Sequence, residues 1–97
     1  MINKVILIGR LGKDPESLPS NNPGCRFSLA TSEKYKGKEQ TEWHNVVVWG
    51  NLVEPCLEFL EKGKLVYIEG KLQTNTWEKQ GQKHYTTQVV ANIVKFL

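Results

Sequence analysis

The sequence predicts an all-β fold, a small closed barrel of five strands with one short α-helix between the third and the fourth strand. Two observations lead to this prediction. Five segments show the alternation or the β-branched composition of strands, while only the stretch between Gly50 and Gly63 repeats apolar residues at helical spacing. The chain has 97 residues, the size of one domain, so we expect residues 1–97 to form a single domain with a modest core.

Three strands are expected before the helix: Asn3–Arg10, Cys25–Thr31 and Thr41–Gly50. The first is a short run rich in β-branched residues, the second alternates apolar and polar side chains, and the third has the strongest strand pattern in the chain. Asp14–Gly24 is crowded with Pro, Ser, Asn and Gly, and Ser32–Gln40 is polar and basic. Both are therefore expected to be loops.

The apolar period changes between Gly50 and Gly63. Five side chains then fall on one helical face: Leu52, Val53, Cys56, Leu57 and Leu60. Asn51 and Glu54 have the spacing of a capping pair, and Gly63 follows Lys62 as a C-terminal stop. We therefore expect a short helix with one buried face.

Strand character returns at Lys64–Trp77, and after a turn at residues 79–82 a last strand covers His84–Phe96. Gly70 lies inside the first of these long strands, where a missing side chain permits a bend at a barrel corner. Three strands, a short helix and two long strands are the order of the oligonucleotide- and oligosaccharide-binding (OB) fold. An SH3-like barrel is the chief structural alternative.

Composition and cysteine usage narrow the class of protein. The net charge is only +3, which excludes a strongly acidic surface but does not by itself predict a nucleic-acid partner. Cys25 and Cys56 lie inside apolar runs and are expected to be buried, reduced thiols. No metal-site spacing relates them to His44 or His84, so we predict no metal and no cofactor. Nothing resembles an export signal or a membrane span, which predicts a soluble, cytoplasmic protein.

The strand Thr41–Gly50 holds the most informative side chains. Period-two alternation divides it into one face with Trp43, Asn45, Val47 and Trp49 and another with His44, Val46 and Val48. The second set is compact enough for the interior of a small barrel, so Trp43 and Trp49 are expected to point outward. Exposed tryptophans are costly unless they meet a partner.

Trp77 lies in a polar stretch and Tyr35 in a basic one, so neither has the setting of a core residue. Outward aromatics interleaved with lysines are typical of a single-strand binding groove, where bases stack for about 1–3 kcal/mol each and lysines contact phosphates. The alternative is that some of these aromatics lie in the core or in a subunit interface. Phe27, Phe59 and Phe96 have apolar settings and are expected in the core.

Catalytic motifs are missing from the sequence. It contains no GxSxG, P-loop, HExxH or paired-carboxylate pattern, and Gly9-Arg10-Leu11-Gly12 lacks the third glycine of a dinucleotide site. The two histidines have no carboxylate or cysteine partner at catalytic spacing. We expect no enzymatic activity. A protein-interaction barrel without a nucleic-acid role is the alternative from a different class.

Five blocks of the sequence resemble bacterial single-stranded DNA-binding proteins, in that family's order and spacing. They are Asn3–Glu16 (NKVILIGRLGKDPE), Phe27–Ser32 (FSLATS), Thr41–Gly50 (TEWHNVVVWG), Val66–Leu72 (VYIEGKL) and Tyr85–Val90 (YTTQVV). The resemblance implies an OB fold, a homotetramer, and tight, sequence-independent binding of single-stranded DNA in replication, recombination and repair.

By the same resemblance, the family's stacking aromatics correspond to Tyr35, Trp43, Trp49 and Trp77, and two subunit-interface positions correspond to His44 and Tyr67. Strongly basic members have Arg or Lys at five positions that lack positive charge here: Asn45, Asn51, Glu61, Gln73 and Asn75. Phosphate contacts are therefore expected from other side chains: Lys4, Arg10, Lys34, Lys62 and Lys71.

The family also ends in a flexible linker and a short acidic tail that recruits other genome-maintenance proteins, whereas this sequence stops at Leu97. Two alternatives follow. The chain is the DNA-binding core of a longer protein, or it is a tail-less relative such as the primosomal replication-restart protein PriB, a small dimeric OB protein. The blocks WHNVVVWG and VYIEGKL favour the first alternative.

Overall fold

The computed structural model describes residues 1–19 and 21–97. Within them the chain forms the following elements: β1 (Val5–Leu11), β2 (Glu16–Ser17), β3 (Gly24–Tyr35), β4 (Lys38–Trp49), a 3₁₀ turn (Gly50–Leu52), α1 (Val53–Phe59), β5 (Leu65–Lys79) and β6 (Gln82–Phe96). Residue 20, inside the expected loop Asp14–Gly24, lies outside the described residues. The described part of that loop contains β2, which pairs with β3.

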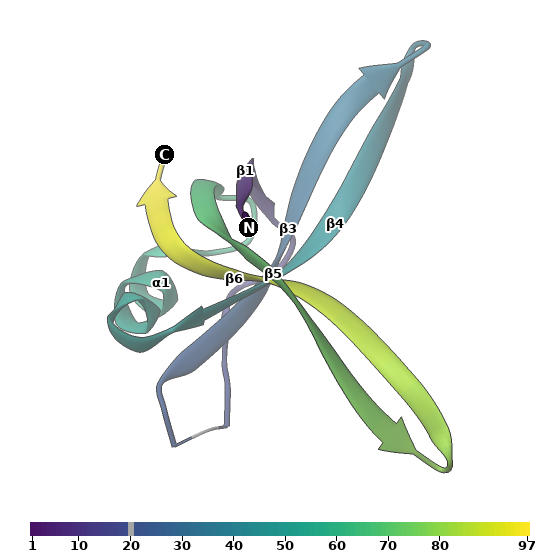
Figure 1. Cartoon of the computed structure of the whole chain (residues 1–97). Helices are drawn as coiled ribbons and strands as arrows, with labels where there is room; N and C mark the ends of the chain where they lie inside the picture. The colour runs from purple at the N-terminus through teal and green to yellow at the C-terminus, as the bar shows by residue number, and fades with distance from the viewer. Residues whose placement is uncertain (20) are drawn as a thin grey trace.

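β1 pairs with β5 along one edge and with β3 along the other, and so closes the sheet into a barrel. The strand order is β1-β5-β6-β4-β3, and β1 pairs again with β3 where Arg10 lies opposite Ala30. β4 and β6 run parallel, with Val46 opposite Val89, while the other barrel pairings are antiparallel. Figure 1 shows α1 beside the barrel, in the connection from β4 to β5. The expected five-stranded OB barrel with one short helix is confirmed.

The barrel interior is filled by the inward faces of the strands and by α1. Val46 and Val48 of β4 are fully buried, and α1 contributes Val53 and Cys56. Cys25 and Cys56 are both free and buried, as their apolar settings predicted. A hydrogen bond with the Cys25 thiol, together with burial, raises the pKa of the Cys56 thiol. Among the described residues, no group of three or more His, Cys, Asp or Glu side chains is arranged so that it could hold a metal ion.

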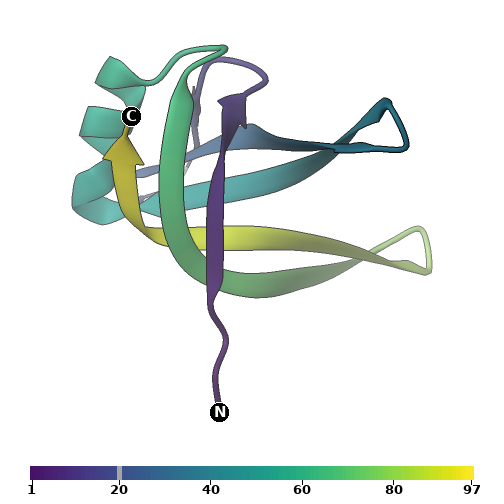
Figure 2. The same cartoon turned by 90° about the horizontal axis from the view of Figure 1, so that it is seen from above.

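β3 with β4, and β5 with β6, form two hairpins that run on past the barrel as two-stranded arms, here called the first and the second arm (Figures 1 and 2). Each ends in a turn of two residues with positive φ, Lys36 and Gly37 in the first arm and Gln80 and Gly81 in the second. This turn geometry matches the twist of a hairpin. The turn expected in the second arm is confirmed. Ser32–Gln40, expected to be a loop, is instead the end of a continuous hairpin.

β5 bends at Gly70, as the sequence predicted. Glu69 lies opposite Ile93 and Gly70 lies opposite Ala91, so Asn92 is an extra residue that forms a bulge in β6. A Cβ at Gly70 would collide with the facing backbone of β6. The missing side chain therefore lets the two strands approach closely at the barrel corner.

The helix differs from the prediction at its start and on one side. The chain enters it through the 3₁₀ turn and Leu52 is the N-cap, so the capping pair expected from Asn51 and Glu54 is not formed. Leu57, expected to be buried, is 40% exposed because a seven-residue helix beside a barrel buries only a narrow stripe. Within residues 1–19 and 21–97, no helix has the length and apolar character needed to cross a membrane.

Only one of the three phenylalanines expected in the core lies there. Phe27 is buried, whereas Phe59 and Phe96 are exposed and pack against each other, with ring centroids 5.8 Å apart. Each is the last residue of its element, α1 or β6. At the margin of the barrel a large ring is covered on one side only, and the two rings shield each other in part.

Candidate nucleic-acid interface

β4 places two tryptophans on the outer surface of the barrel. Alternation along the strand turns Val46 and Val48 into the core and leaves Trp43 60% and Trp49 42% exposed. The outward orientation predicted from the sequence is confirmed. Val47 lies between the tryptophans on the same side of the strand and is buried, so this surface has an apolar floor.

The second arm adds a third tryptophan to this surface. Val47 of β4 lies opposite Val90 of β6, and both side chains point outward. Every second residue of β6 from Val90 back to His84 also points outward, and Trp77 of β5 lies opposite His84. The rings of Trp77 and His84, which are opposite each other, stack with centroids 5.4 Å apart and 20° between their planes. Trp77 is 45% exposed. The imidazole covers one face of this indole and leaves the other accessible.

Tyr35 lies apart from the three tryptophans. It ends β3, opposite Lys38 at the tip of the first arm. The unbroken register of that arm puts Tyr35 on the opposite face of the ribbon from Trp43. Its ring is exposed, with the ammonium of Lys36 5.4 Å from the ring centroid. The structure therefore brings together three of the four predicted stacking residues and separates the fourth.

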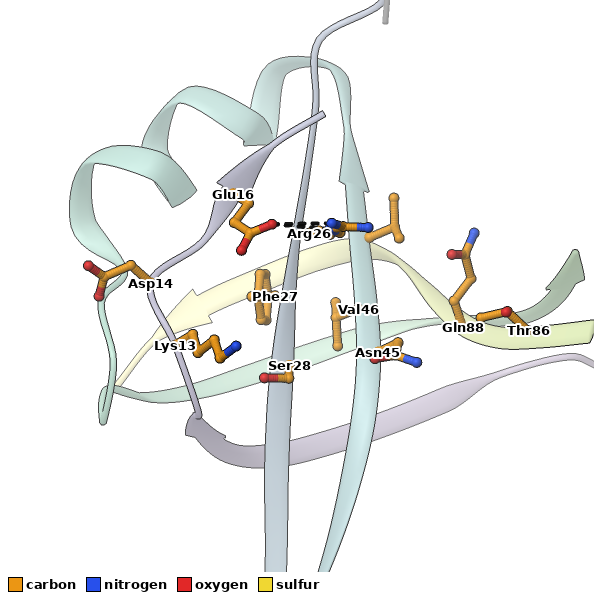
Figure 3. Close-up of a pocket in the computed structure, with 11 residues that line it drawn as sticks. Lys13, Asp14, Glu16, Arg26, Phe27, Ser28, Asn45, Val46, Thr86 and Gln88 are labelled. Carbon is orange, nitrogen blue, oxygen red and sulfur yellow. Dashed lines mark hydrogen bonds and ion pairs between the residues drawn. The ribbon is translucent and has the colours of Figure 1, made fainter. Parts of the chain in front are cut away.

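A cavity of about 290 Å³ opens on the tryptophan surface, where β3 and β4 meet β6 (Figure 3). Its polar lining consists of Lys13, Asp14, Glu16, Arg26, Ser28, Asn45, Thr86 and Gln88, with Val47 among its apolar residues. Amide and hydroxyl side chains such as these can both donate and accept hydrogen bonds. The surface between the tryptophans can thus contact the polar edges of bases as well as their faces.

Lys13 and Arg26 bring positive charge to this cavity, although neither was among the predicted phosphate contacts. Arg26 Nη2 lies 3.2 Å from Glu16 Oε2, so a carboxylate partly compensates the guanidinium (Figure 3). No ion pair within the described residues involves Lys13. The polar alternation of β3 showed that Arg26 faces outward. Nothing in the sequence indicated that the chain after β1 folds back beside β3, where the Gly12 N–H donates to the Ser28 carbonyl.

Three of the five side chains predicted to contact phosphates lie on the tryptophan side of the barrel or at the rim of the cavity. Strand alternation puts Lys34 of the first arm and Lys71 of β5 on the tryptophan side. Lys62 lies just after α1, and its backbone N–H donates to Asp14 Oδ1 at 2.9 Å. Asp14 lines the cavity, so Lys62 is close to the cavity rim.

The other two predicted cations already have partners within the chain. Arg10 Nη1 donates to the Gly63 carbonyl at 3.0 Å. Lys4 Nζ lies 3.0 Å from Glu69 Oε1, and the Tyr67 hydroxyl donates to Glu69 Oε2 at 2.8 Å. A phosphate would have to compete with Glu69 for the Lys4 ammonium.

The same contacts shift three pKa values. Hydrogen bonds from Lys4 and Tyr67 lower the pKa of the Glu69 carboxyl, because they favour its charged form. The hydrogen bond to Glu69 raises the pKa of the Lys4 ammonium and that of the Tyr67 hydroxyl, because both must be protonated to donate it. The three side chains therefore form one linked polar group.

The two residues expected at subunit contacts occupy different places. His44 is half-buried, and its Nε2 lies 2.9 Å from Thr31 Oγ1. Tyr67 lies opposite Ile8 on the outer side of β1 and β5. Ile6 and Ile8 both project from β1 and are each 54% exposed. Tyr67 thus borders an apolar strip that the chain by itself leaves uncovered.

Comparison with known proteins agrees with this arrangement. The family model described as "Single-strand binding protein family" matches residues 2–97. "Single-stranded DNA-binding protein 1" of Chlorobaculum tepidum is 46% identical over 105 residues, which cover 99% of this chain and 65% of that protein. The chain therefore spans about two thirds of the length of this relative.

A solved structure gives the same result for the fold. The structure described as "Plasmodium falciparum SSB complex with ssDNA" matches with a TM-score of 0.88 and 34% sequence identity. The match covers 100% of this chain and 96% of the other. From the family match over nearly the whole chain and the close relative, we conclude that this chain belongs to the single-strand binding protein family.

Proposed function

We propose that this chain binds single-stranded DNA without sequence preference and thereby protects it during replication, recombination and repair. The observation that carries this proposal is the exposure of Trp43, Trp49 and Trp77 on one continuous surface around a polar cavity. A folded domain rarely leaves three indole rings in water unless they meet a partner. Nucleobases are that partner in proteins that hold single strands.

Binding combines stacking with phosphate contacts. Bases stack on the accessible faces of the three indoles, and every base has such a face, so stacking is indifferent to sequence. The lysines on this side of the barrel and at its cavity contact the DNA backbone and release its counterions: Lys13, Lys34, Lys62 and Lys71. The family match and the absence of catalytic motifs from the sequence both support a binding protein rather than an enzyme.

We further propose that the chain acts in the cytoplasm as a homotetramer. A domain of this size gains stability when subunits cover its apolar surface. The exposed Ile6 and Ile8, bordered by Tyr67, form such a surface on β1 and β5. His44 is expected at or near a second contact.

Titration with oligothymidine, followed by tryptophan fluorescence, tests the DNA-binding proposal. Stacking should quench the emission strongly. Trp43→Ala and Trp77→Ala should each weaken binding by about 1–3 kcal/mol while the fold is retained, because each removes one stacking surface. Tyr35→Ala should have a smaller effect, since Tyr35 lies apart from the tryptophans.

Leu97→Ala is the matched control, because it removes an exposed apolar side chain beside the start of β5 rather than from the tryptophan surface. It should leave the affinity unchanged. If both tryptophan variants bind as tightly as the wild type, the proposed surface is wrong. If wild-type emission does not respond to the oligonucleotide, the aromatics serve a protein interface instead.

A further inference from the structure

The eight glycines of the chain all lie in the described residues and fall into three groups by what a side chain at each position would meet. Four have positive φ and open space around them: Gly37, Gly50, Gly63 and Gly81. Gly9 and Gly70 face backbone atoms of a neighbouring strand. Gly12 and Gly24 differ from these six, because what each faces most closely is the indole ring of an exposed tryptophan.

Gly24 lies directly opposite Trp49 in the pairing of β3 with β4. A Cβ at Gly24 would lie 2.5 Å from Cζ3 and 2.7 Å from Cε3 of the Trp49 ring, well inside van der Waals contact. The backbone of Gly24 does not have a positive φ, so it suits any residue. The ring of Trp49, and not the backbone, is therefore what excludes a side chain at this position.

Gly12 has the same relation to Trp43. A Cβ at Gly12 would collide with Cζ3 of Trp43 and would lie 2.8 Å from its Cη2. Here too φ is not positive, and the hydrogen bond from the Gly12 N–H to the Ser28 carbonyl (3.1 Å) holds the backbone beside β3. The ring of Trp43 therefore lies across the backbone of a segment that is distant in the sequence.

We propose that Gly24 and Gly12 are positioning residues of the DNA interface, because each leaves the space in which the indole of Trp49 or Trp43 lies against the barrel. This inference rests on the proposed function, in which the two rings stack on bases. A ring that lies on a glycine has one side covered by backbone and the other side presented outward. Its orientation is then set before DNA arrives, so less conformational freedom is lost on binding.

An alanine at either position would move the ring. Carbon atoms in contact are about 3.5–4.0 Å apart, so the ring edge has to lift by roughly 1 Å. The backbone cannot yield as easily, because Gly24 is paired with Trp49 and backbone hydrogen bonds hold it in place, from the Gly50 N–H to the Pro23 carbonyl and from the Leu18 N–H to the Gly24 carbonyl. The lifted ring would no longer lie flat on the barrel and would present a tilted face to a base.

A double-mutant cycle on the full chain tests the proposal with oligothymidine as the probe. Its members are wild type, Gly24→Ala, Trp49→Ala and the double variant. Trp49→Ala is expected to weaken binding about 5- to 100-fold, and Gly24→Ala about 3- to 10-fold, because a tilted ring keeps part of its stacking. In the Trp49→Ala background, Gly24→Ala should change the affinity less than 1.5-fold. The parallel cycle uses Gly12→Ala and Trp43→Ala.

Two further measurements separate positioning from loss of stability. Gly24→Ala should shift the wild-type tryptophan emission maximum, and it should raise Tm in the Trp49→Ala background, because glycine weakens a strand when no ring needs the space. Ile68→Val removes a methyl group from the barrel interior, whereas both rings lie on the outer surface, so it controls for mild destabilisation. It should lower Tm and leave the affinity unchanged.

Three results would overturn the inference, and they can be told apart. If Trp49→Ala binds like the wild type, the stacking in the proposed function fails, and this inference fails with it. If Trp49→Ala is weak but Gly24→Ala binds normally, only the positioning role fails. An equal loss from Gly24→Ala in both backgrounds would assign the effect to the strand and not to the ring.

Discussion

At the scale of single residues, the Glu69 carboxylate makes the stability of the fold depend on pH. Its lowered pKa means that the contacts with Lys4 and Tyr67 stabilise the fold above its ordinary pKa of 4.5 and are lost as the pH falls through the lowered value. The raised pKa values of Lys4 and Tyr67 give a stability contribution with the opposite dependence on pH. Their contribution is present below about pH 10 and is lost as the pH rises through the raised values.

We therefore expect Glu69→Gln to lower the free energy of unfolding at neutral pH and to match the wild type in acid. Urea unfolding of both proteins, at pH 7 and again well below pH 4, measures the difference. The neutral amide keeps the shape of the side chain, so packing is unchanged. A difference of the same size at both pH values would show that the ionised carboxylate is not its source.

Residue by residue, the sequence predicted orientation well wherever a strand has one buried face. Alternation placed Trp43 and Trp49 outside and Val46 and Val48 inside. Successive side chains of a strand point to opposite faces of the sheet, and only one face meets the core. Phe59 was mispredicted for a physical reason. An apolar neighbourhood in the sequence shows that a side chain could be buried, but burial also needs neighbours in space, and these run out at the end of an element.

At the scale of elements, the first arm shows where polar composition misleads. Strand patterns appear when one face packs on a core, and Ser32–Gln40 lies beyond the barrel, where neither face of the ribbon does. The sequence feature that does indicate a hairpin here is the pair of residues at its turn. Lys36-Gly37 has the same form as Gln80-Gly81, a long polar residue before a glycine, so the pattern that predicts a hairpin turn at the second pair applies equally to the first.

The bend of β5 yields a stability prediction. Gly70→Ala should lower the free energy of unfolding by roughly 1–3 kcal/mol, because the added Cβ meets backbone of β6 that is fixed by strand pairing. Thermal unfolding and urea titration measure this loss. Gln73→Ala, at an exposed position of the same strand, is the control and should change stability by less than about 0.5 kcal/mol. Equal stability of the Gly70 variant would mean that the bulge can absorb a side chain.

At the scale of the whole molecule, assembly is tested at His44. This imidazole is half-buried beside Thr31, and we expect it near a subunit contact. His44→Lys introduces a charge there and should shift the population towards smaller species in sedimentation velocity, with unchanged circular dichroism. A stable wild-type monomer would contradict the proposed tetramer. A stable wild-type dimer would favour the replication-restart alternative.

The balance of charge and stacking predicts the salt dependence of binding. The five positions that are basic in strongly basic family members are neutral or acidic here, while all four predicted stacking aromatics are present. Affinity for single strands falls with salt at a slope of about −0.7 per phosphate neutralised. We therefore expect a shallower slope of log affinity against log salt than those members show on the same oligothymidine.

Arginine substitutions can restore the missing phosphate contacts. Asn45→Arg and Gln73→Arg lie on the tryptophan side of their strands and should each steepen the slope by about 0.7. Glu58→Gln raises the net charge by the same single unit on α1 and should leave the slope unchanged. A wild-type slope as steep as that of the basic members would show that lysines elsewhere have replaced the lost contacts.

The two arms have a further consequence for how the molecule behaves in solution. Past the barrel, each strand of an arm is paired along one edge and open to water along the other. Amide hydrogen exchange should therefore quicken stepwise from the barrel towards the turns at Lys36-Gly37 and Gln80-Gly81. A DNA strand laid along an arm would slow exchange in the segments that it covers. The exchange gradient of the free protein, compared with that of the complex, would then trace the path of the strand without any mutation.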